Sequence, residues 1–298
     1  MSRLYEALRK SEQENQQKGV ATSEAPRPTE VLSTIAPTVM AATPVELEMA
    51  KTVQPQVSAE CHLEALTDPH SLAAEKFRVL LTRLDNLRGQ RELKSVQVTS
   101  GVTDEGKTLI SANLAVTMAR HSQTRILLVE GDLHNPGLHS LFGLSRVKGI
   151  CQWWADPKSP ITDFVYRLGD LPLWYLPAGG RFAEPGALLQ SSRFAETFAQ
   201  LAGLFDWTIV DSTPLLPMAD ANIWNRLVDG TLLVVRENVT PVNSIKKGLE
   251  SLDDPKLVGV VLNGASEFDR IGYYDQYYSS RNGSKKNQAK DKAAEVHE

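Results

Sequence analysis

Several features are missing from this sequence, and each absence excludes a class of protein. No apolar run approaches the roughly 18 to 20 residues that a membrane-spanning helix needs, and the start (MSRLYEALRK) lacks the apolar core of a signal peptide. The two cysteines, Cys61 and Cys151, form neither a disulfide framework nor a metal-ligand pattern. The net charge of −4 argues against binding nucleic acid by bulk electrostatics. We therefore expect a cytoplasmic protein with no nucleic-acid partner, which works at the inner face of a membrane only if a partner protein recruits it.

The stretch from Gly101 to Thr108 (GVTDEGKT) fits the phosphate-loop pattern of Gly, four residues, Gly-Lys and Ser or Thr. A strand-like segment (93–99) precedes it, and a segment with apolar residues at helical spacing (109–120) follows it. Such a loop turns backbone N–H groups toward phosphate oxygens, and the N-terminus of the next helix adds a favourable dipole. Lys107 would reach the β- and γ-phosphates, and the Thr108 hydroxyl would ligate Mg²⁺. The residues expected to bind the nucleoside triphosphate are Gly101, Thr103, Asp104, Glu105, Gly106, Lys107, Thr108 and Leu109.

From residue 93 onward, strand-like and helical segments alternate along the chain. Several strand-like segments are continuous apolar runs, which is typical of strands buried on both faces of a parallel sheet. The pattern predicts a doubly wound α/β domain of the P-loop NTPase type over residues 66–270, with a mainly parallel sheet and helices on both faces. The expected strands are 93–99, 125–129, 171–176, 207–210, 231–235 and 257–262, and the expected helices include 71–87, 109–120, 184–204 and 242–252.

The two ends of the chain differ from this domain in composition. Residues 1–14 predict an amphipathic helix that is too short to be stable alone, so it is either a frayed terminus or a docking helix. Residues 15–65 are rich in Gln, Thr, Ala, Pro and Glu and predict a disordered linker. Residues 271–298 predict a mobile tail that begins with tyrosines and continues with polar residues.

Two acidic motifs follow predicted strands, at the edge where α/β sheets place their ligands. Asp211 ends the strand WTIV, and a buried carboxylate there needs a cationic partner such as Mg²⁺–ATP. We expect Asp211 to hold the metal directly or through water, the alternative being a simple turn initiator. Glu130 and Asp132 follow the strand RILLV, and they could hold Mg²⁺ or take a proton from an attacking hydroxyl group.

A cluster of tyrosines lies beyond the last predicted strand. Four of the chain's seven tyrosines fall within six residues, as adjacent pairs that fit neither the strand period nor the helix period. They are candidate phosphate acceptors, although an aromatic patch that packs on the domain or on a partner is an equal alternative. The four residues are Tyr273, Tyr274, Tyr277 and Tyr278.

Together these motifs resemble those of the bacterial tyrosine autokinases (BY-kinases) that accompany capsular and exopolysaccharide synthesis, in the form without a fused transmembrane adaptor. The resemblance covers about residues 68–278 and the first ten residues. The matching segments are MSRLYEALRK at the start, DEGKT (104–108), EGDLHNP (130–136), FDWTIVDSTPLLPMADA (205–221) and GVVLN (259–263).

The resemblance implies transfer of the ATP γ-phosphate to the tyrosine cluster, with roles for individual residues. Lys107 would neutralise developing charge, and Thr108, Asp211 and Asp132 would hold Mg²⁺. Asp132 with Glu130 would orient or deprotonate the tyrosine hydroxyl. Asn263 would lie near the adenine.

The resemblance also implies partners and a regulatory role. Glu75 and Arg78 match the family's self-association motif, so the helix that carries them would join one copy to the next. A membrane adaptor of the chain-length-determinant type and a tyrosine phosphatase would be further partners. The kinase would then regulate the polymerisation or export of a surface polysaccharide.

Four positions depart from the family pattern. Glu130 replaces Asp, His134 replaces a permanently charged Arg, Asp104 replaces the first Gly of the loop, and Leu81 replaces the second Arg of the self-association motif. These changes favour, as an alternative, an ATP-binding scaffold with weak or no kinase activity. An ATPase of the partitioning and septum-positioning type shares the fold but generally carries an early loop lysine, which residues 100–103 (SGVT) lack.

Overall fold

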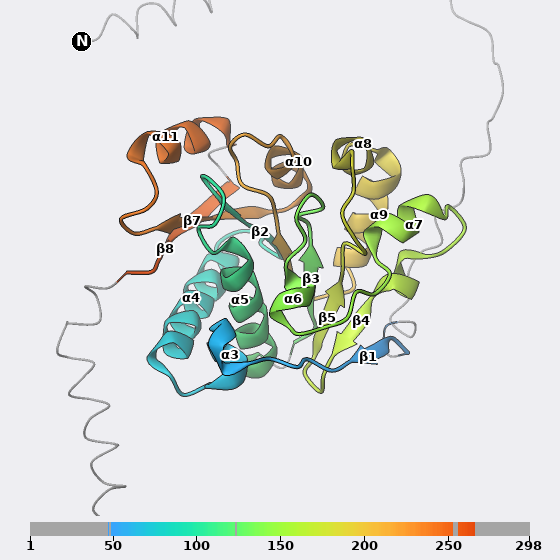
Figure 1. Cartoon of the computed structure of the whole chain (residues 1–298), viewed down its shortest axis with the longest axis horizontal. Helices are drawn as coiled ribbons and strands as arrows, with labels where there is room; N and C mark the ends of the chain where they lie inside the picture. The colour runs from blue at the N-terminus through green and yellow to red at the C-terminus, as the bar shows by residue number, and fades with distance from the viewer. Residues whose placement is uncertain (1–46, 48, 123, 253–255, 266–298) are drawn as a thin grey trace, which may run out of the picture. The chain divides into compact units, whose positions relative to one another are not determined.

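The computed structural model describes residue 47 and residues 49–122, 124–252 and 256–265 (Figure 1). Over this part of the chain, eight strands form one sheet in the order β1-β4-β5-β3-β6-β2-β7-β8. Every neighbouring pair is parallel except β4 with β5, which is antiparallel. The strands are β1 (Lys51–Val53), β2 (Ser95–Ser100), β3 (Ile126–Glu130), β4 (Tyr166–Leu168), β5 (Leu173–Leu176), β6 (Trp207–Asp211), β7 (Gly230–Arg236) and β8 (Leu257–Asn263).

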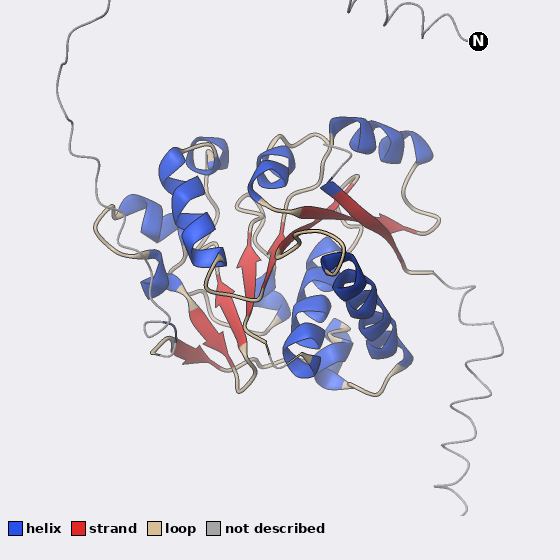
Figure 2. Cartoon of the chain, turned by 180° about the vertical axis from the view of Figure 1, so that it is seen from behind, coloured by secondary structure: helices blue, strands red, loops and turns tan. Residues whose placement is uncertain are grey.

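Helices cover both faces of this sheet, as Figure 2 shows. The α-helices are α3 (Glu64–Thr67), α4 (Leu72–Arg88), α5 (Lys107–His121), α6 (Leu138–Leu141), α7 (Ile150–Ala155), α8 (Pro185–Leu189), α9 (Ser192–Ala202), α10 (Asp220–Leu227) and α11 (Val242–Ser251), and the 3₁₀-helices are η1 (Ala59–Cys61) and η2 (Ile161–Phe164). The doubly wound, mainly parallel α/β fold predicted from the sequence is confirmed.

Strand β3 shows why its sequence is a continuous apolar run. Ile126 and Leu128 lie in the hydrophobic cluster that includes the apolar side chains of α4 and α5. Leu127 and Val129 lie in the cluster on the other face, with side chains of α7, α8, α9 and α10. Both faces of the strand are therefore buried, and no polar alternation is possible until it ends.

The helix expected over residues 184–204 is two helices, α8 and α9. The chain is extended at Ser191, whose hydroxyl accepts a hydrogen bond from the N–H of Phe194 at 3.1 Å and so begins α9. Apolar residues continue at helical spacing through the break, so their periodicity does not mark it, whereas Ser191 is a preferred N-cap residue. Ser71 caps α4 in the same way, by accepting a hydrogen bond from the N–H of Ala74 at 3.1 Å.

The linker expected over residues 15–65 extends too far, because the chain is already folded from residue 49. Strand β1 pairs with β4, and Leu63 and Ala65 are buried in the cluster that includes α5. The N–H of Ala65 also donates to the Asn113 side chain of α5 at 2.9 Å. A few apolar residues suffice here because they add to a sheet and a helix formed elsewhere in the chain. Residues 15–46 and the predicted helix over residues 1–14 lie outside the described residues.

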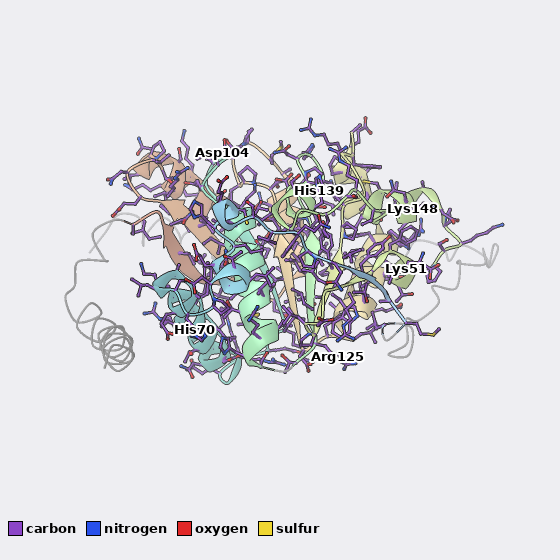
Figure 3. All side chains as sticks on the ribbon, turned by 60° about the horizontal axis from the view of Figure 1, so that its bottom comes forward. Lys51, His70, Asp104, Arg125, His139 and Lys148 are labelled. Atoms are coloured by element: carbon purple, nitrogen blue, oxygen red, sulfur yellow. The ribbon has the colours of Figure 1, made fainter. Side chains whose placement is uncertain are left out.

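The turns that carry the predicted site lie together at one edge of the sheet. Figure 3 shows Asp104 and His139 at the upper edge, while Arg125, just before β3, lies at the lower edge. The upper edge is therefore the carboxyl edge of the parallel strands, where α/β proteins place their ligands.

Candidate active site

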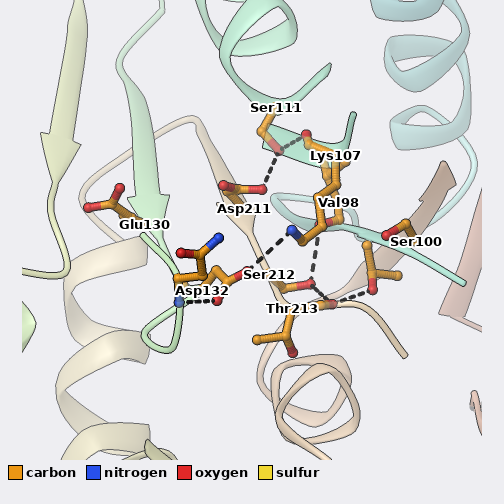
Figure 4. A network of polar contacts seen from close by, with 12 residues as sticks. Val98, Ser100, Lys107, Ser111, Glu130, Asp132, Asp211, Ser212 and Thr213 are labelled. Atoms are coloured by element: carbon orange, nitrogen blue, oxygen red, sulfur yellow. Dashed lines mark hydrogen bonds and ion pairs between the residues drawn. The ribbon is translucent and has the colours of Figure 1, made fainter. Parts of the chain in front are cut away.

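Three neighbouring strands bring the predicted phosphate loop and carboxylates together. The sheet order places β6 between β3 and β2, and Glu130 at the end of β3 pairs in register with Asp211 at the end of β6. The phosphate loop follows β2 directly. Because parallel strands end at the same edge, Lys107, Asp132 and Asp211 converge there (Figure 4).

The phosphate loop has two residues in the left-handed backbone region. Asp104 has φ 61°, and Gly106, which precedes the first turn of α5, has φ 94°. Asp is among the few residues that adopt this conformation readily, so Asp104 is tolerated where BY-kinases have Gly. At Gly106 the positive φ favours glycine, and a Cβ atom would also displace the side-chain amide of Asn263.

Asn263 lies against the loop, at the end of β8. Its side-chain amide donates a hydrogen bond to the carbonyl oxygen of Glu105 at 2.8 Å. The structure thus brings Asn263 to the phosphate loop, while its expected place near the adenine stays a prediction.

Lys107 and Asp132 form an ion pair that is almost shielded from solvent. Lys107 Nζ lies 3.2 Å from Asp132 Oδ2, and their side chains are 13% and 6% exposed. Asp132 Oδ1 accepts a hydrogen bond from the N–H of Asn135 at 2.9 Å, which fixes the orientation of the carboxylate. A cation and a carboxylate thus stand together at the N-terminus of α5.

Asp211 is fully buried at the centre of the site. Burial raises the pKa of its carboxyl from 3.8 to about 7, which outweighs the lowering effect of Lys107 and the Thr108 hydroxyl. Oδ1 lies 3.4 Å from the Ser111 hydroxyl, whereas Oδ2 has no hydrogen bond of good geometry, although the Thr108 hydroxyl is close enough to affect the pKa. A buried carboxylate oxygen without a donor fits a cation bound beside it.

The oxygen donors of the site are of the kind that Mg²⁺ accepts. Among the described residues, no group of three or more His, Cys, Asp and Glu side chains is arranged to hold a metal ion. Mg²⁺ is usually bound by one or two carboxylates together with waters and substrate phosphates. Asp211, Asp132 and Thr108 are the groups of this site that match such an arrangement.

Glu130 is not brought to the Lys107–Asp132 pair. Its carboxylate is 1% exposed and accepts three hydrogen bonds, from the N–H of Leu138 (2.8 Å), the N–H of Ala178 (3.0 Å) and the hydroxyl of Tyr175 (2.9 Å). In Figure 4 it points away from Lys107. Burial, and then Glu130, raise the pKa of Tyr175 well above 10, so its hydroxyl remains a donor. Glu130 is thus engaged with donors of the protein itself, and its role in handling the substrate proton stays a prediction.

His134 also makes a contact that the sequence alone does not reveal. Its Nε2 lies 3.0 Å from Asp220 Oδ2, at the start of α10. Burial raises the pKa of Asp220, and His134 acts against this shift. The residue that replaces the family's Arg thus ties the loop after β3 to α10.

The sequence analysis did not predict three residues of the site, which are Ser111, Tyr175 and Asp220. Ser111 stands four residues after Lys107, so helical spacing places it on the same face of α5, and this signal was available. Tyr175 and Asp220 lie far from Glu130 and His134 in sequence, and no local pattern pairs them.

The proposed self-association motif lies on α4. Arg78 is hydrogen-bonded to Glu75 and donates to the carbonyl oxygen of Pro69 at 2.9 Å. Leu81, which replaces the family's second Arg, is buried in the hydrophobic core. The cluster Tyr273, Tyr274, Tyr277 and Tyr278 lies outside the described residues.

The fold and this site define a P-loop nucleotide-binding protein. No family model matches the chain, but individual proteins do. Tyrosine-protein kinase YwqD of Bacillus subtilis is 32% identical over 214 residues, which are 70% of this chain and 90% of YwqD. The chain belongs to the family of bacterial tyrosine-protein kinases and is a protein-tyrosine kinase, as the resemblance implied.

Two further proteins extend this comparison. The succinoglycan biosynthesis transport protein ExoP of Rhizobium meliloti is 31% identical over 215 residues, which are 70% of this chain but 27% of ExoP. The crystal structure of the chimerical protein CapA2B2 superposes with a TM-score of 0.65 at 26% identity, over 75% of this chain and 97% of the chimera. Within the described part of the chain, no helix has the length and apolar character to cross a membrane.

Proposed function

We propose that this kinase transfers the γ-phosphate of ATP to tyrosines of its own C-terminal segment. The acceptors are Tyr273, Tyr274, Tyr277 and Tyr278, and the modification regulates the polymerisation or export of a surface polysaccharide. The observation that carries the proposal is the Lys107–Asp132 pair beside the buried Asp211, at the end of a phosphate loop. The similarity to ExoP, named for succinoglycan biosynthesis, supports the link to a polysaccharide.

Each residue of the site has a separate role in phosphoryl transfer. Lys107 binds the phosphates and neutralises the charge that develops on them. Thr108, Asp211 and Asp132 would hold Mg²⁺, which would supply positive charge to stabilise the phosphates. Asp132 is also the carboxylate that accepts the proton of the tyrosine hydroxyl, since Lys107 has the phosphates as an alternative anionic partner once they are bound.

Glu130 is a positioning residue in this scheme. Its hydrogen bonds to Leu138, Tyr175 and Ala178 join the loop after β3 to the end of β5. The longer side chain reaches these groups from the end of β3 and leaves Asp132 as the carboxylate that faces Lys107.

Membership of the family suggests three partners: a second copy of this chain, a membrane adaptor and a tyrosine phosphatase. Self-association through α4, with Glu75 and Arg78, would present the tyrosines of one copy to the site of the next. A membrane adaptor would recruit the kinase to the inner face of the membrane, and a tyrosine phosphatase would reverse the modification. Each added phosphate brings about −1.5 to −2 charge, so phosphorylation is expected to loosen the assembly.

A second candidate function is an ATP-binding scaffold with weak phosphate transfer. The specific observation in its favour is that His134, which replaces a permanent cation, is paired with Asp220. In this case the tyrosine cluster would be a docking surface.

One experiment separates the two functions. Intact-mass spectrometry of the purified protein, before and after incubation with Mg²⁺–ATP, should show added phosphates that map to residues 273–278. A variant with all four clustered tyrosines changed to Phe should show none. Nucleotide binding without added phosphate, both alone and with the adaptor's cytoplasmic segment, would favour the scaffold.

A further inference from the structure

The side chain of Glu105 folds back to the start of the phosphate loop, and its carboxylate has no part in the proposed chemistry. The residue is fully buried, although it belongs to a loop that must receive a triphosphate. Its Oε2 accepts a hydrogen bond from the N–H of Val102 at 3.0 Å, across the turn of the loop. Its Oε1 accepts a hydrogen bond from the Thr240 hydroxyl. The carboxylate therefore joins the start of the loop to a residue 135 positions further along the chain.

Two more residues from the same region hold the loop. The Arg236 guanidinium donates to the carbonyl oxygen of Asp104 at 3.1 Å, and the Asn263 amide donates to that of Glu105 at 2.8 Å. Thr240 in turn accepts a hydrogen bond from the N–H of Arg236 at 2.9 Å. We call Arg236, Thr240 and Asn263 the brace: Arg236 ends β7, Thr240 lies in the turn between β7 and α11, and Asn263 ends β8. All three contact Asp104 or Glu105 of the loop.

A structural cost accompanies this arrangement. A carboxylate in a phosphate loop opposes the negative charge of the ligand, and a buried carboxylate is tolerated only when donors satisfy it. Because this carboxylate is buried and bonded to other parts of the protein, any gain that offsets the cost must come from the shape that it gives the loop. The hydrogen bond to Val102 closes the turn, and the bond to Thr240 fixes that turn against the brace.

We infer that Glu105 is a positioning residue, which holds the phosphate loop in its nucleotide-binding shape by linking it to the brace through Thr240. This inference rests on the proposed nucleotide binding at the same loop. A loop that adopts its binding shape only part of the time binds more weakly by that fraction. Loss of the link should therefore weaken nucleotide affinity while every backbone N–H group that the loop turns toward the phosphates, including that of Glu105, is retained.

Helix α11, which follows Thr240, also lies against the loop. A Cβ atom at Gly101 would stand 3.7 Å from the Ser244 carbonyl oxygen, and one at Gly248 would stand 3.8 Å from Gly101 Cα. The start of the loop thus packs on α11 while Glu105 binds Thr240 just before that helix. A shift of α11 would reach the loop through both contacts.

The test compares nucleotide affinity with stability in matched variants. Glu105→Ala leaves Val102 and Thr240 without their acceptor, and Kd for Mg²⁺–ADP by calorimetry should rise about tenfold, as expected for two buried hydrogen bonds. Glu105→Gln should stay within about threefold of the wild type, because its oxygen can accept from Val102 and its amide can donate to Thr240. A fall in melting temperature for Glu105→Ala with Kd unchanged would overturn the inference.

Thr240 gives a second test that does not depend on how Glu105→Ala folds. Thr240→Val keeps the shape but loses the hydroxyl, and Kd should rise about threefold, as one hydrogen bond predicts, while Thr240→Ser should restore it. In the double variant, Glu105→Ala with Thr240→Val should bind no more weakly than Glu105→Ala alone. Equal affinities for the Val and Ser variants would contradict the link through Thr240.

The wild type distinguishes this inference from the proposed function. A wild-type protein that binds no Mg²⁺–ADP would refute the proposed function and the inference with it. A wild type that binds and transfers phosphate, together with Glu105 and Thr240 variants that bind equally well, would refute the positioning role alone.

Discussion

Asp211→Asn is expected to stabilise the protein at neutral pH while removing its magnesium-dependent activity. Burial raises the pKa of Asp211 from 3.8 to about 7, so the folded state favours the protonated carboxyl. A group whose pKa is higher in the folded state contributes stability below its unfolded pKa, and this stability is lost as the pH rises through the folded pKa. The loss from Asp211 should therefore occur between about pH 4 and pH 7.

The size of this effect follows from the two pKa values. The pKa is 3.8 in the unfolded state and about 7 in the folded state. Between these values the free energy of unfolding falls by about 1.4 kcal/mol per pH unit, so raising the pH from about 5 to about 8 should lower it by about 2.5 kcal/mol. Asn cannot ionise, so Asp211→Asn should lack this loss. Mg²⁺ bound at the carboxylate would instead favour the ionised form, so its binding near pH 6 should release protons.

Urea unfolding at about pH 5 and about pH 8, without nucleotide or Mg²⁺, measures the effect directly. Over this interval the free energy of unfolding should fall by about 2.5 kcal/mol more in the wild type than in Asp211→Asn. Asp170→Asn, which removes one charge from an exposed position, is a matched control and should behave like the wild type. Equal pH dependence in the wild type and Asp211→Asn would refute the argument that burial controls this carboxyl.

Other variants separate reacting groups from supporting ones. Asp132→Asn should remove phosphate transfer while the melting temperature stays within a few degrees of the wild type, and a variant that still autophosphorylates at the wild-type rate would exclude Asp132 as the base. Glu130→Ala leaves the Tyr175 hydroxyl and two backbone N–H groups buried without an acceptor, so urea unfolding should show a loss of about 2 to 5 kcal/mol; an unchanged stability would show that these bonds contribute little. Ser191→Ala removes the cap of α9 and should destabilise the protein by about 1 kcal/mol, with Ser191→Asp as the variant that keeps the cap; equal destabilisation by Ala and Asp would contradict this role.

The parts of the fold that the sequence predicts are those with strong local patterns. The continuous apolar run of β3, the largely apolar WTIV segment of β6 and the GVTDEGKT loop can be recognised from the sequence alone. The rule that parallel strands end at one edge then places Lys107, Asp132 and Asp211 together. Strand β1 has three residues and no such pattern, because its stability comes from pairing with β4. Strand β4 is equally short and is defined by its neighbours in the sheet.

The orientation of the site's side chains could not be predicted in the same way. Glu130 and Asp132 are two residues apart at the end of a strand, and their spacing alone predicts that they act together. The partners that turn Glu130 away, Tyr175 and Ala178, lie 45 and 48 residues further along the chain. Glu105 and Thr240 are separated by 135 residues, so only the folded structure reveals that they are joined.

Three successive residues at the end of β3 and in the turn after it make different contacts. Glu130 anchors the turn to the end of β5, and Asp132 faces Lys107. Between them, Gly131 packs so closely on β6 that a Cβ atom would stand 2.7 Å from Val210 Cγ1, and its N–H donates to the Asp211 carbonyl oxygen at 2.8 Å. This close approach keeps the Asp132 side of the turn beside Asp211.

Two departures from the family pattern, at positions 130 and 134, therefore affect how the turn after β3 is held more than they affect the groups that react. At position 130 the longer carboxylate is used in hydrogen bonds within the fold, and at position 134 the histidine is paired with Asp220 of α10. Neither change removes the cation of Lys107, the carboxylate of Asp132 or the unsatisfied oxygen of Asp211. Since phosphoryl transfer depends on charge placed at the reacting oxygens, a site that keeps these three groups favours efficient phosphate transfer over the weak transfer of the scaffold.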